Sequence, residues 1–165
     1  MSRAAERRRR WQPPRFVDEE IDEGRVRAAL FAQHERLRVM LTRLEAKALE
    51  LIRSGTGAAP ELAAELAGVA TAFEDHTRGE ERALTRLLPR TAAASRALAV
   101  LREDHRCQRE ELGAMSRLAA RCDDAITLAL AVRGFVSDLR LDMDAEDRRL
   151  LSPRPLDGEP ADAEG

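Results

Sequence analysis

Residues 73–89 read FEDHTRGEERALTRLLP, and this stretch places a histidine and a carboxylate where a hydrophobic core is expected. At helical spacing, one stripe runs from Phe73 to Leu87 and includes His76 and Glu80, which are four residues apart. Burying two such polar groups costs free energy unless a partner satisfies them, and a metal ion is one candidate. The stretch therefore predicts a helix whose inner face carries candidate metal ligands.

The same periodicity extends over most of the chain and predicts four helices. In order, they are expected from about residue 22 to the Ser54–Gly57 break, from Pro60 to Pro89, from a Thr91 cap to Arg121–Cys122, and from an Asp123 or Asp124 cap to Ser152–Pro153. Four long helices with short connections pack most easily as an up-down-up-down antiparallel bundle. The fold class predicted is all-α.

Composition supports one helical domain with two tails. The 165 residues are 44% hydrophobic, 35% charged and only 3% aromatic, a balance that suits helices better than a β-sandwich. We expect a flexible Arg-rich and acidic arm at 1–21, the bundle at 22–153 and a disordered tail at 154–165. The net charge of −2 gives no global attraction to nucleic acid or membranes. The basic arm is the one segment that could touch nucleic acid or an anionic surface, and the acids beside it favour a solvated tail instead.

The two cysteines indicate a reducing compartment. Cys107 and Cys122 lie on one predicted helix, roughly 22 Å apart at about 1.5 Å per residue, so they cannot form a disulfide within the chain. No apolar segment follows the arginine run as a secretory signal would require, and none approaches the length of a membrane span. A cytoplasmic location is expected.

Five polar positions are predicted to meet inside the bundle. In an antiparallel bundle, helices one and three begin at the end where helices two and four finish. Counted from that end, five residues lie at similar depth: His34, His76, Glu80, His105 and Asp142. Because they include all three histidines of the chain and come from four different helices, we interpret the layer as a metal site.

These motifs resemble the hemerythrin-like, or HHE cation-binding, family of four-helix bundles with a non-haem di-iron centre. The resemblance covers about residues 26–153, and its most specific part is F-x-x-H-x-x-x-E-E from Phe73 to Glu81. Single histidines in FAQHERL and REDHRCQ occur in the expected order. The resemblance implies that His34 and His76 ligate one iron and that Glu80 bridges to the second.

Helices three and four depart from the family pattern. In LDMDAEDRRLL, Asp142 stands where the family usually has a histidine, and either Glu146 or Asp147 is expected as the second bridging carboxylate. Arg109 stands where many members have a second histidine in helix three, and a cation there would repel a metal ion. The second position then keeps His105 and Asp142, an asymmetric, oxygen-rich site at which manganese or another divalent ion becomes plausible.

Two classes of function follow. In the first, one or two non-haem iron ions serve dioxygen or nitric oxide binding or sensing, or iron handling. In the alternative, the bundle is a degenerate, metal-free interaction or regulatory module in which Arg109 pairs with Asp142 or Glu146. No enzyme activity is expected: the chain has no tyrosine, and Cys107 and His105 point about 200° apart on their helix. Glu81 is expected to face solvent, and no motif identifies a protein partner.

Overall fold

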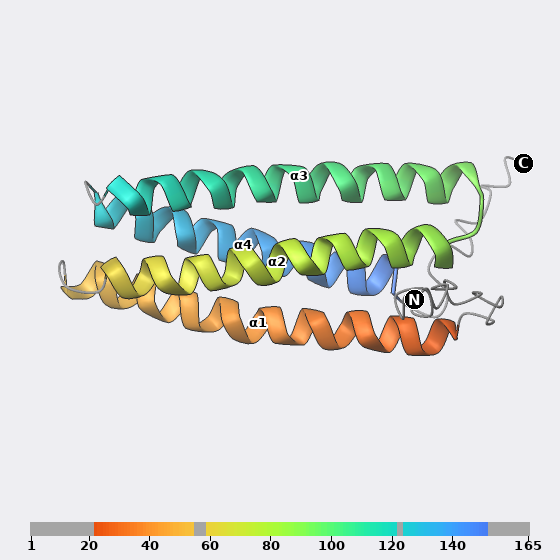
Figure 1. Ribbon diagram of the computed structural model, residues 1–165, viewed down its shortest axis with the longest axis horizontal. Helices are drawn as coiled ribbons and strands as arrows, with labels where there is room; N and C mark the ends of the chain where they lie inside the picture. Colours follow the sequence, from red (N-terminus) through yellow and green to blue (C-terminus); the bar gives the residue numbers. More distant parts are fainter. Residues whose placement is uncertain (1–21, 55–58, 122–123, 152–165) are drawn as a thin grey trace, which may run out of the picture.

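A computed structural model describes residues 22–54, 59–121 and 124–151 (Figure 1). These residues form four helices: α1 (Glu23–Ser54), α2 (Ala59–Leu87), α3 (Ala92–Arg121) and α4 (Ala125–Arg149). The bounds agree closely with those expected from the periodicity of apolar residues. The predicted arm at 1–21 and tail at 154–165 lie outside the described residues.

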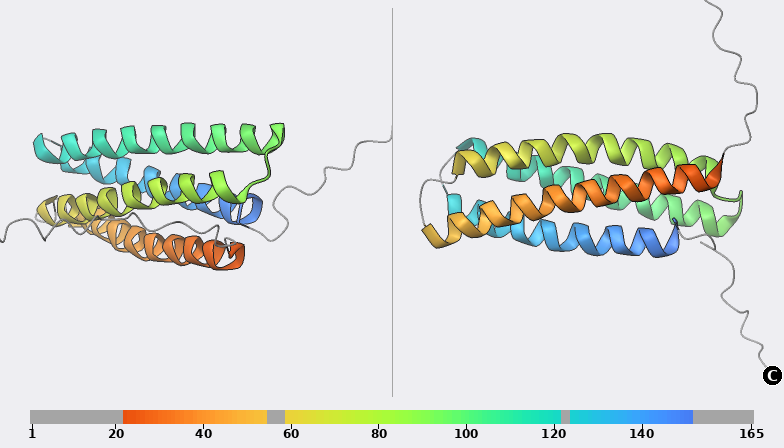
Figure 2. Two further views of the ribbon diagram at one scale, coloured as in Figure 1. Left: turned by 45° about the vertical axis from the view of Figure 1, so that its right-hand side comes forward. Right: turned by 90° about the horizontal axis from the view of Figure 1, so that it is seen from below.

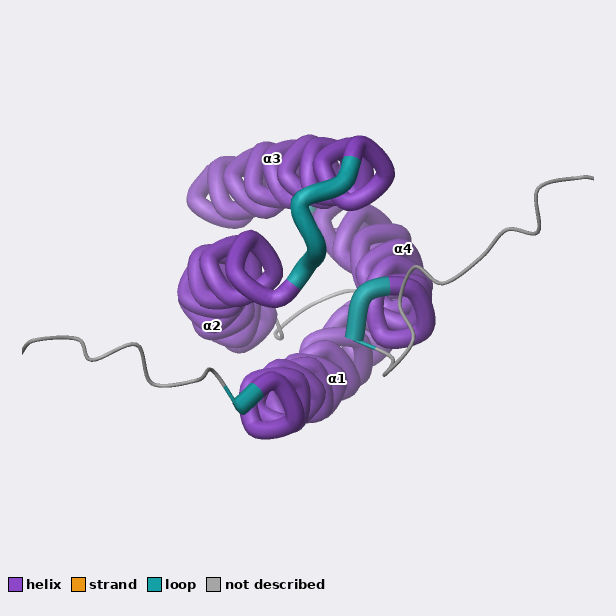
Figure 3. Tube along the Cα trace, turned by 90° about the vertical axis from the view of Figure 1, so that its right-hand side faces the viewer, coloured by secondary structure: helices purple, strands orange, loops and turns teal. Residues whose placement is uncertain are grey.

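The helices form the predicted up-down-up-down antiparallel bundle. Each helix packs beside the next in the sequence, and α4 returns to pack against α1 (Figures 1 and 2). Seen along the bundle axis, α2 and α4 stand diagonally opposite each other, as do α1 and α3 (Figure 3). All four helices therefore present one face to a shared interior.

Two helices begin at the capping residues that the sequence indicates. Thr91 Oγ1 accepts a hydrogen bond from the backbone N–H of Ala94 at 3.1 Å, before α3. Asp124 Oδ1 accepts one from the backbone N–H of Thr127 at 2.9 Å, so Asp124 is the N-cap of α4. Both side chains satisfy backbone donors that the first helical turn leaves without partners.

The core consists of two apolar clusters separated by a polar layer. The larger cluster fills the part of the bundle toward the α1–α2 and α3–α4 connections and includes Leu41, Leu66 and Val132. The smaller cluster lies near the opposite end and includes Leu30, Leu84 and Leu150. Between them are six buried polar residues: His34, His76, Thr77, Glu80, His105 and Gln108.

Within the residues that the structure describes, no helix combines the length and apolar composition needed to cross a bilayer.

Candidate metal centre

The polar layer brings together ligand-type side chains from all four helices. His34 comes from α1, His76 and Glu80 from α2, His105 from α3 and Glu146 from α4. Each histidine lies on the inward stripe of its helix, with leucine, phenylalanine or alanine a turn or two away on either side. The helical periodicity that builds the core therefore also aims these side chains at one another.

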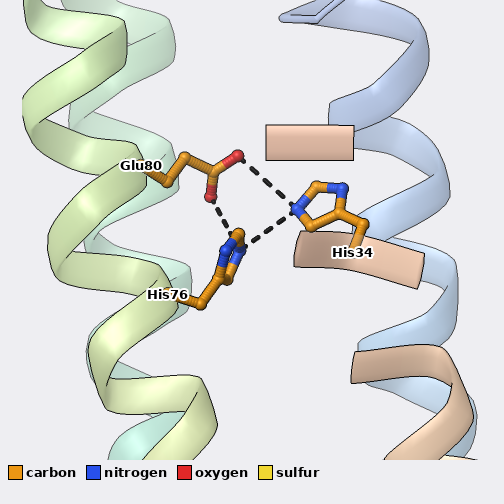
Figure 4. A group of neighbouring side chains, drawn as sticks. All are labelled: His34, His76 and Glu80. Atoms are coloured by element: carbon orange, nitrogen blue, oxygen red, sulfur yellow. Dashed lines mark hydrogen bonds and ion pairs between the residues drawn. The ribbon is translucent and has the colours of Figure 1, made fainter. Parts of the chain in front are cut away.

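Three residues form a first group with metal-ligand spacing: His34, His76 and Glu80 (Figure 4). The Nε2 atoms of His34 and His76 are 3.1 Å apart. Oε1 of Glu80 lies 3.6 Å from Nε2 of His34, and Oε2 lies 3.3 Å from Nε2 of His76. Two imidazole nitrogens and a carboxylate thus face a common point.

A second group consists of Glu80, His105 and Glu146. Nε2 of His105 lies 3.4 Å from Oε2 of Glu80 and 3.7 Å from Oε1 of Glu146. The other oxygen of Glu146, Oε2, lies 3.6 Å from Nε2 of His34 in the first group. Glu80 and Glu146 therefore each touch both groups, as carboxylates that bridge two positions would.

The outer nitrogen of every histidine is held by an oxygen. The Nδ1 contacts are His34 with Asp147 Oδ1 at 2.7 Å, His76 with Gln33 Oε1 at 3.0 Å, and His105 with Glu81 Oε1 at 3.0 Å. An oxygen of this kind accepts a hydrogen bond, so each Nδ1 carries a proton. In a neutral ring the Nε2 lone pair then points inward, which is the arrangement found in metal-ligating histidines.

This arrangement leaves the interior in need of a cation. With both Nδ1 atoms protonated, the Nε2 atoms of His34 and His76 face each other at 3.1 Å with no proton between neutral rings. Glu80 is fully buried, and neither of its carboxylate oxygens accepts a hydrogen bond in the described part of the chain. A buried carboxylate and facing lone pairs are costly unless a positive charge satisfies them. The donor set of imidazole nitrogens and carboxylate oxygens suits a transition-metal ion.

Without a metal, protons supply part of that positive charge. Burial alone would lower the pKa of His105, but the carboxylates of Glu146, Glu80 and Glu81 raise it to about 10. Burial alone would raise the pKa of Glu80, but the imidazoles of His105 and His76 lower it to about 2. Burial raises the pKa of Glu146, and the neighbouring carboxylate of Glu80 adds to the increase. The metal-free centre thus favours an ionised Glu80 beside a protonated His105.

Glu146 and Asp147, which the sequence leaves as alternatives, occupy different places. Glu146 turns into the centre with its side chain 12% exposed. Asp147 holds His34 from outside and also accepts a hydrogen bond from Arg38 Nη2 at 2.7 Å. Asp142, predicted near the second position, belongs to neither group of close ligand atoms and instead accepts from Gln108 Nε2 at 2.8 Å.

Arg109 points toward α2. Its Nη1 donates to Thr77 Oγ1 at 3.1 Å and lies 3.7 Å from Oε1 of Glu81, and its side chain is 33% exposed. This differs from the pairing with Asp142 or Glu146 expected for a metal-free bundle, because the adjacent Gln108 takes the buried position. The guanidinium is instead next to the carboxylate that holds His105.

The expectation that Glu81 faces solvent is wrong. Glu81 is about 100° around α2 from Glu80, which turns it toward α3 rather than outward, and it reaches Nδ1 of His105. Gln33 was likewise not singled out in the sequence, although it directly precedes His34. In the sequence, a polar residue stands directly beside a candidate ligand at His34, Glu80 and Glu146. Such a neighbour is the sequence signal for a side chain that holds a ligand from outside the centre.

The comparisons with known proteins agree with this geometry. The model of the hemerythrin HHE cation binding domain matches residues 25–152, most of the chain. The protein therefore belongs to the hemerythrin HHE cation-binding family, which confirms the resemblance seen in its histidine motifs. Membership indicates that the polar layer serves to bind a cation. No curated protein and no solved structure gives a significant match to the chain.

Proposed function

We propose that this protein binds non-haem iron in its polar layer and uses it to bind or sense dioxygen or nitric oxide, or to store or deliver the metal. The observation that carries the proposal is the orientation of the three histidines. Each Nδ1 is held by an oxygen from outside, and each Nε2 lies within 3.6 Å of a Glu80 oxygen, with the Nε2 atoms of His34 and His105 also close to Glu146. The presence of an exposed Cys107 thiol is consistent with a cytoplasmic location.

The two positions would differ in their ligands. His34, His76 and Glu80 would hold a metal at the first position, with Glu146 in reach. At the second position only His105 supplies nitrogen, beside Glu80 and Glu146. We therefore expect the first position to retain iron more tightly and the second to accept harder ions such as manganese. Bound iron(II) would supply the affinity for dioxygen or nitric oxide.

A cavity between α3 and α4 offers small molecules a route to the second position. Its volume is about 350 Å³, and Glu146 forms part of its wall. The lining is largely apolar and includes Val100, Leu101 and Leu150, with Asp104 and Asp142 at its polar side. An apolar cavity of this size admits a diatomic ligand while limiting water around the metal.

The proposed role is binding rather than catalysis. The layer contains histidines and carboxylates that suit metal coordination, and the chain has no tyrosine for radical chemistry. Cys107 is exposed and lies near Glu103 and Arg106 on the outer face of α3. We therefore assign no nucleophile or general base.

The test is the metal content of protein purified from cells supplied with iron or with manganese, measured beside a His76→Gln, Glu80→Gln double variant. Both substitutions keep the size of the side chain and remove its ability to ligate as imidazole or carboxylate. An Asp104→Asn variant is the matched control, because it removes a charge from the cavity wall outside both groups. Ultraviolet and visible spectra before and after addition of dioxygen or nitric oxide report on ligand binding.

The outcomes separate the proposals. About two irons per chain in the wild type and control, lost in the double variant, would support a di-iron centre. About one iron per chain would support the asymmetric form. Wild-type iron and manganese no higher than in the double variant would overturn metal binding and favour the metal-free interaction module.

A further inference from the structure

We propose that a groove between α2 and α3 binds a small anion that carries two or three linked phosphate groups. The groove has a volume of about 460 Å³ and is lined by six residues: Arg78, Glu81, Arg82, Thr85, Arg86 and Arg102. Five of them come from α2, and Arg102 comes from α3, the neighbouring helix in the bundle (Figure 1). The groove is separate from both groups of candidate metal ligands, and the proposal does not depend on metal binding.

The groove concentrates positive charge on a protein that is slightly acidic overall. Its lining contains four arginines and one carboxylate, whereas the chain has a net charge of −2. Arg78, Arg82 and Arg86 follow one another at intervals of four residues, so they form one stripe along α2. Like charges at this spacing repel each other and destabilise a helix. A bound anion would offset that repulsion.

Two guanidinium groups of the stripe are unpaired. Arg78 pairs with Glu74 at 2.6 Å. Arg82 and Arg86 are exposed, and their side chains make no ion pair or hydrogen bond with any residue in the described ranges 22–54, 59–121 and 124–151. Because a guanidinium group can donate two parallel hydrogen bonds to phosphate oxygens, neighbouring unpaired arginines suit a phosphate ligand.

The carboxylate in the groove is already satisfied by other groups. Glu81 Oε1 accepts the hydrogen bond from His105 Nδ1 at 3.0 Å and lies 3.7 Å from Nη1 of Arg109. Its other oxygen, Oε2, lies 3.9 Å from Nε of Arg102. Arg102 Nη2 also donates to Thr85 Oγ1 at 3.0 Å, which holds its guanidinium group beside the groove. These contacts offset the negative charge of Glu81, so both walls of the groove present cations to an anion.

The dimensions of the groove favour two or three linked phosphates. Arg78 and Arg86 are roughly 12 Å apart along α2, at about 1.5 Å per residue. A single phosphate ion is shorter than this stripe and could pair with neighbouring guanidinium groups only, whereas linked phosphates extend along it. A longer polyanion would run past Arg78 toward Glu74 and Asp75, whose carboxylates would repel it. We therefore assign the groove to a diphosphate or triphosphate.

The experiment is isothermal titration calorimetry of the full chain with inorganic triphosphate, diphosphate and phosphate at low ionic strength. We expect the affinity to increase with the number of phosphates, because each one adds contacts to the stripe. In an Arg82→Gln, Arg86→Gln double variant, the affinity for triphosphate should fall roughly tenfold or more, since both unpaired guanidinium groups are removed. Added salt should weaken binding, as it does for exposed charges in general.

An Arg43→Gln, Arg133→Gln double variant is the matched control. It removes the same number of charges from exposed positions on α1 and α4, outside the groove. Its affinity for triphosphate should stay within about twofold of the wild type, because distant surface charges are screened. The His76→Gln, Glu80→Gln variant should also bind triphosphate as the wild type does, since neither residue lines the groove. Loss of binding in that variant would place the anion at the metal centre and overturn the proposal.

ATP distinguishes the two sources of a phosphate chain. Equal or weaker binding of ATP than of inorganic triphosphate would support an inorganic chain as the ligand, and tighter binding would support a nucleotide. The absence of saturable triphosphate binding up to about 10 mM, or equal losses in the groove and control variants, would overturn the proposal. So would stronger competition by a single-stranded oligonucleotide at equal phosphate concentration, which would indicate a nucleic-acid surface. The helical circular dichroism of each variant shows that loss of binding is not loss of folding.

Discussion

Asp147 holds the ring of His34 from outside the metal centre, and its effect on metal affinity can be separated from its effect on the fold. The neighbouring Asp144 also accepts a hydrogen bond from Arg38 at 2.7 Å but does not touch a histidine. We predict that Asp147→Ala lowers iron affinity about 10- to 100-fold, since the ring loses its fixed tautomer and orientation. Competition with a chelator measures the change.

Asp144→Ala is the control for this prediction. It removes a carboxylate from Arg38 and leaves the contact between Asp147 and His34 in place. Iron affinity in this variant should stay within a few-fold of the wild type. Equal losses in the two variants would mean that the charge near Arg38, rather than the position of His34, controls metal binding.

His105 makes the stability of the metal-free protein depend on pH. Its pKa in the folded chain is about 10, compared with an ordinary value of 6.5, because three carboxylates stabilise the imidazolium despite burial. A raised pKa stabilises the fold fully below pH 6.5, and this contribution is lost as pH rises through 10. We predict that the urea midpoint of metal-free protein falls over this range and falls less in His105→Gln.

The stability of the metal-loaded protein is expected to be nearly independent of pH over the same range. A bound metal takes the place of the proton on Nε2 of His105, so deprotonation no longer removes the positive charge. Its urea midpoint should therefore change little as the pH rises. A decline of the same size with and without metal would show that another group causes it.

At the scale of the helix, the cap of α4 is the clearest local determinant of stability. Asp124 accepts hydrogen bonds from both the backbone N–H and the hydroxyl of Thr127. We predict that Asp124→Ala lowers the free energy of unfolding by about 1 kcal/mol. Asp124→Asn keeps an oxygen acceptor and should retain most of it. Urea denaturation of the three proteins measures the difference, and equal destabilisation by asparagine and alanine would contradict the capping role.

Helix bounds were predictable because their signals are local. The repeat of leucines from Leu30 to Leu51 follows from the α1 sequence alone, and Thr91 and Asp124 precede their helices as typical caps. The identity of the family also followed from local motifs, above all the stretch from Phe73 to Glu81.

The outer shell of the site was not predictable in the same way. Whether Glu81 faces solvent or α3 depends on where α3 stands, and the periodicity of α2 does not contain that information. The same holds for Gln108 and Arg109, adjacent positions of which only one can point into the interior. Sequence spacing identifies the inward stripe of a helix, but the partners at its edges are set by packing between helices.

At the scale of the whole molecule, metal binding should stabilise all four helices together. The two groups of ligand-type residues draw on α1, α2, α3 and α4, so an ion bound there ties each helix to the others. At a free metal concentration of about 100 times the Kd, the stabilisation expected from linkage is about 2.7 kcal/mol. We predict a higher melting temperature with iron(II) under anaerobic conditions, measured by circular dichroism.

The His76→Gln, Glu80→Gln variant controls for metal effects elsewhere on the surface. Its melting temperature should not respond to iron(II), because the first group has lost two of its three residues. An equal increase in this variant would place the stabilising ion outside the polar layer.

The polar layer between the two apolar clusters also fixes the register of the helices along the bundle axis. A core made of leucines alone would stabilise several registers almost equally, because sliding one helix by a turn of about 5.4 Å still places leucine against leucine. Here the same slide would bring His34 or His105 against apolar side chains of one cluster and leave Glu80 facing leucine. Each misaligned bundle would bury polar groups without partners. The residues that suit a cation thus also restrict the four helices to one register.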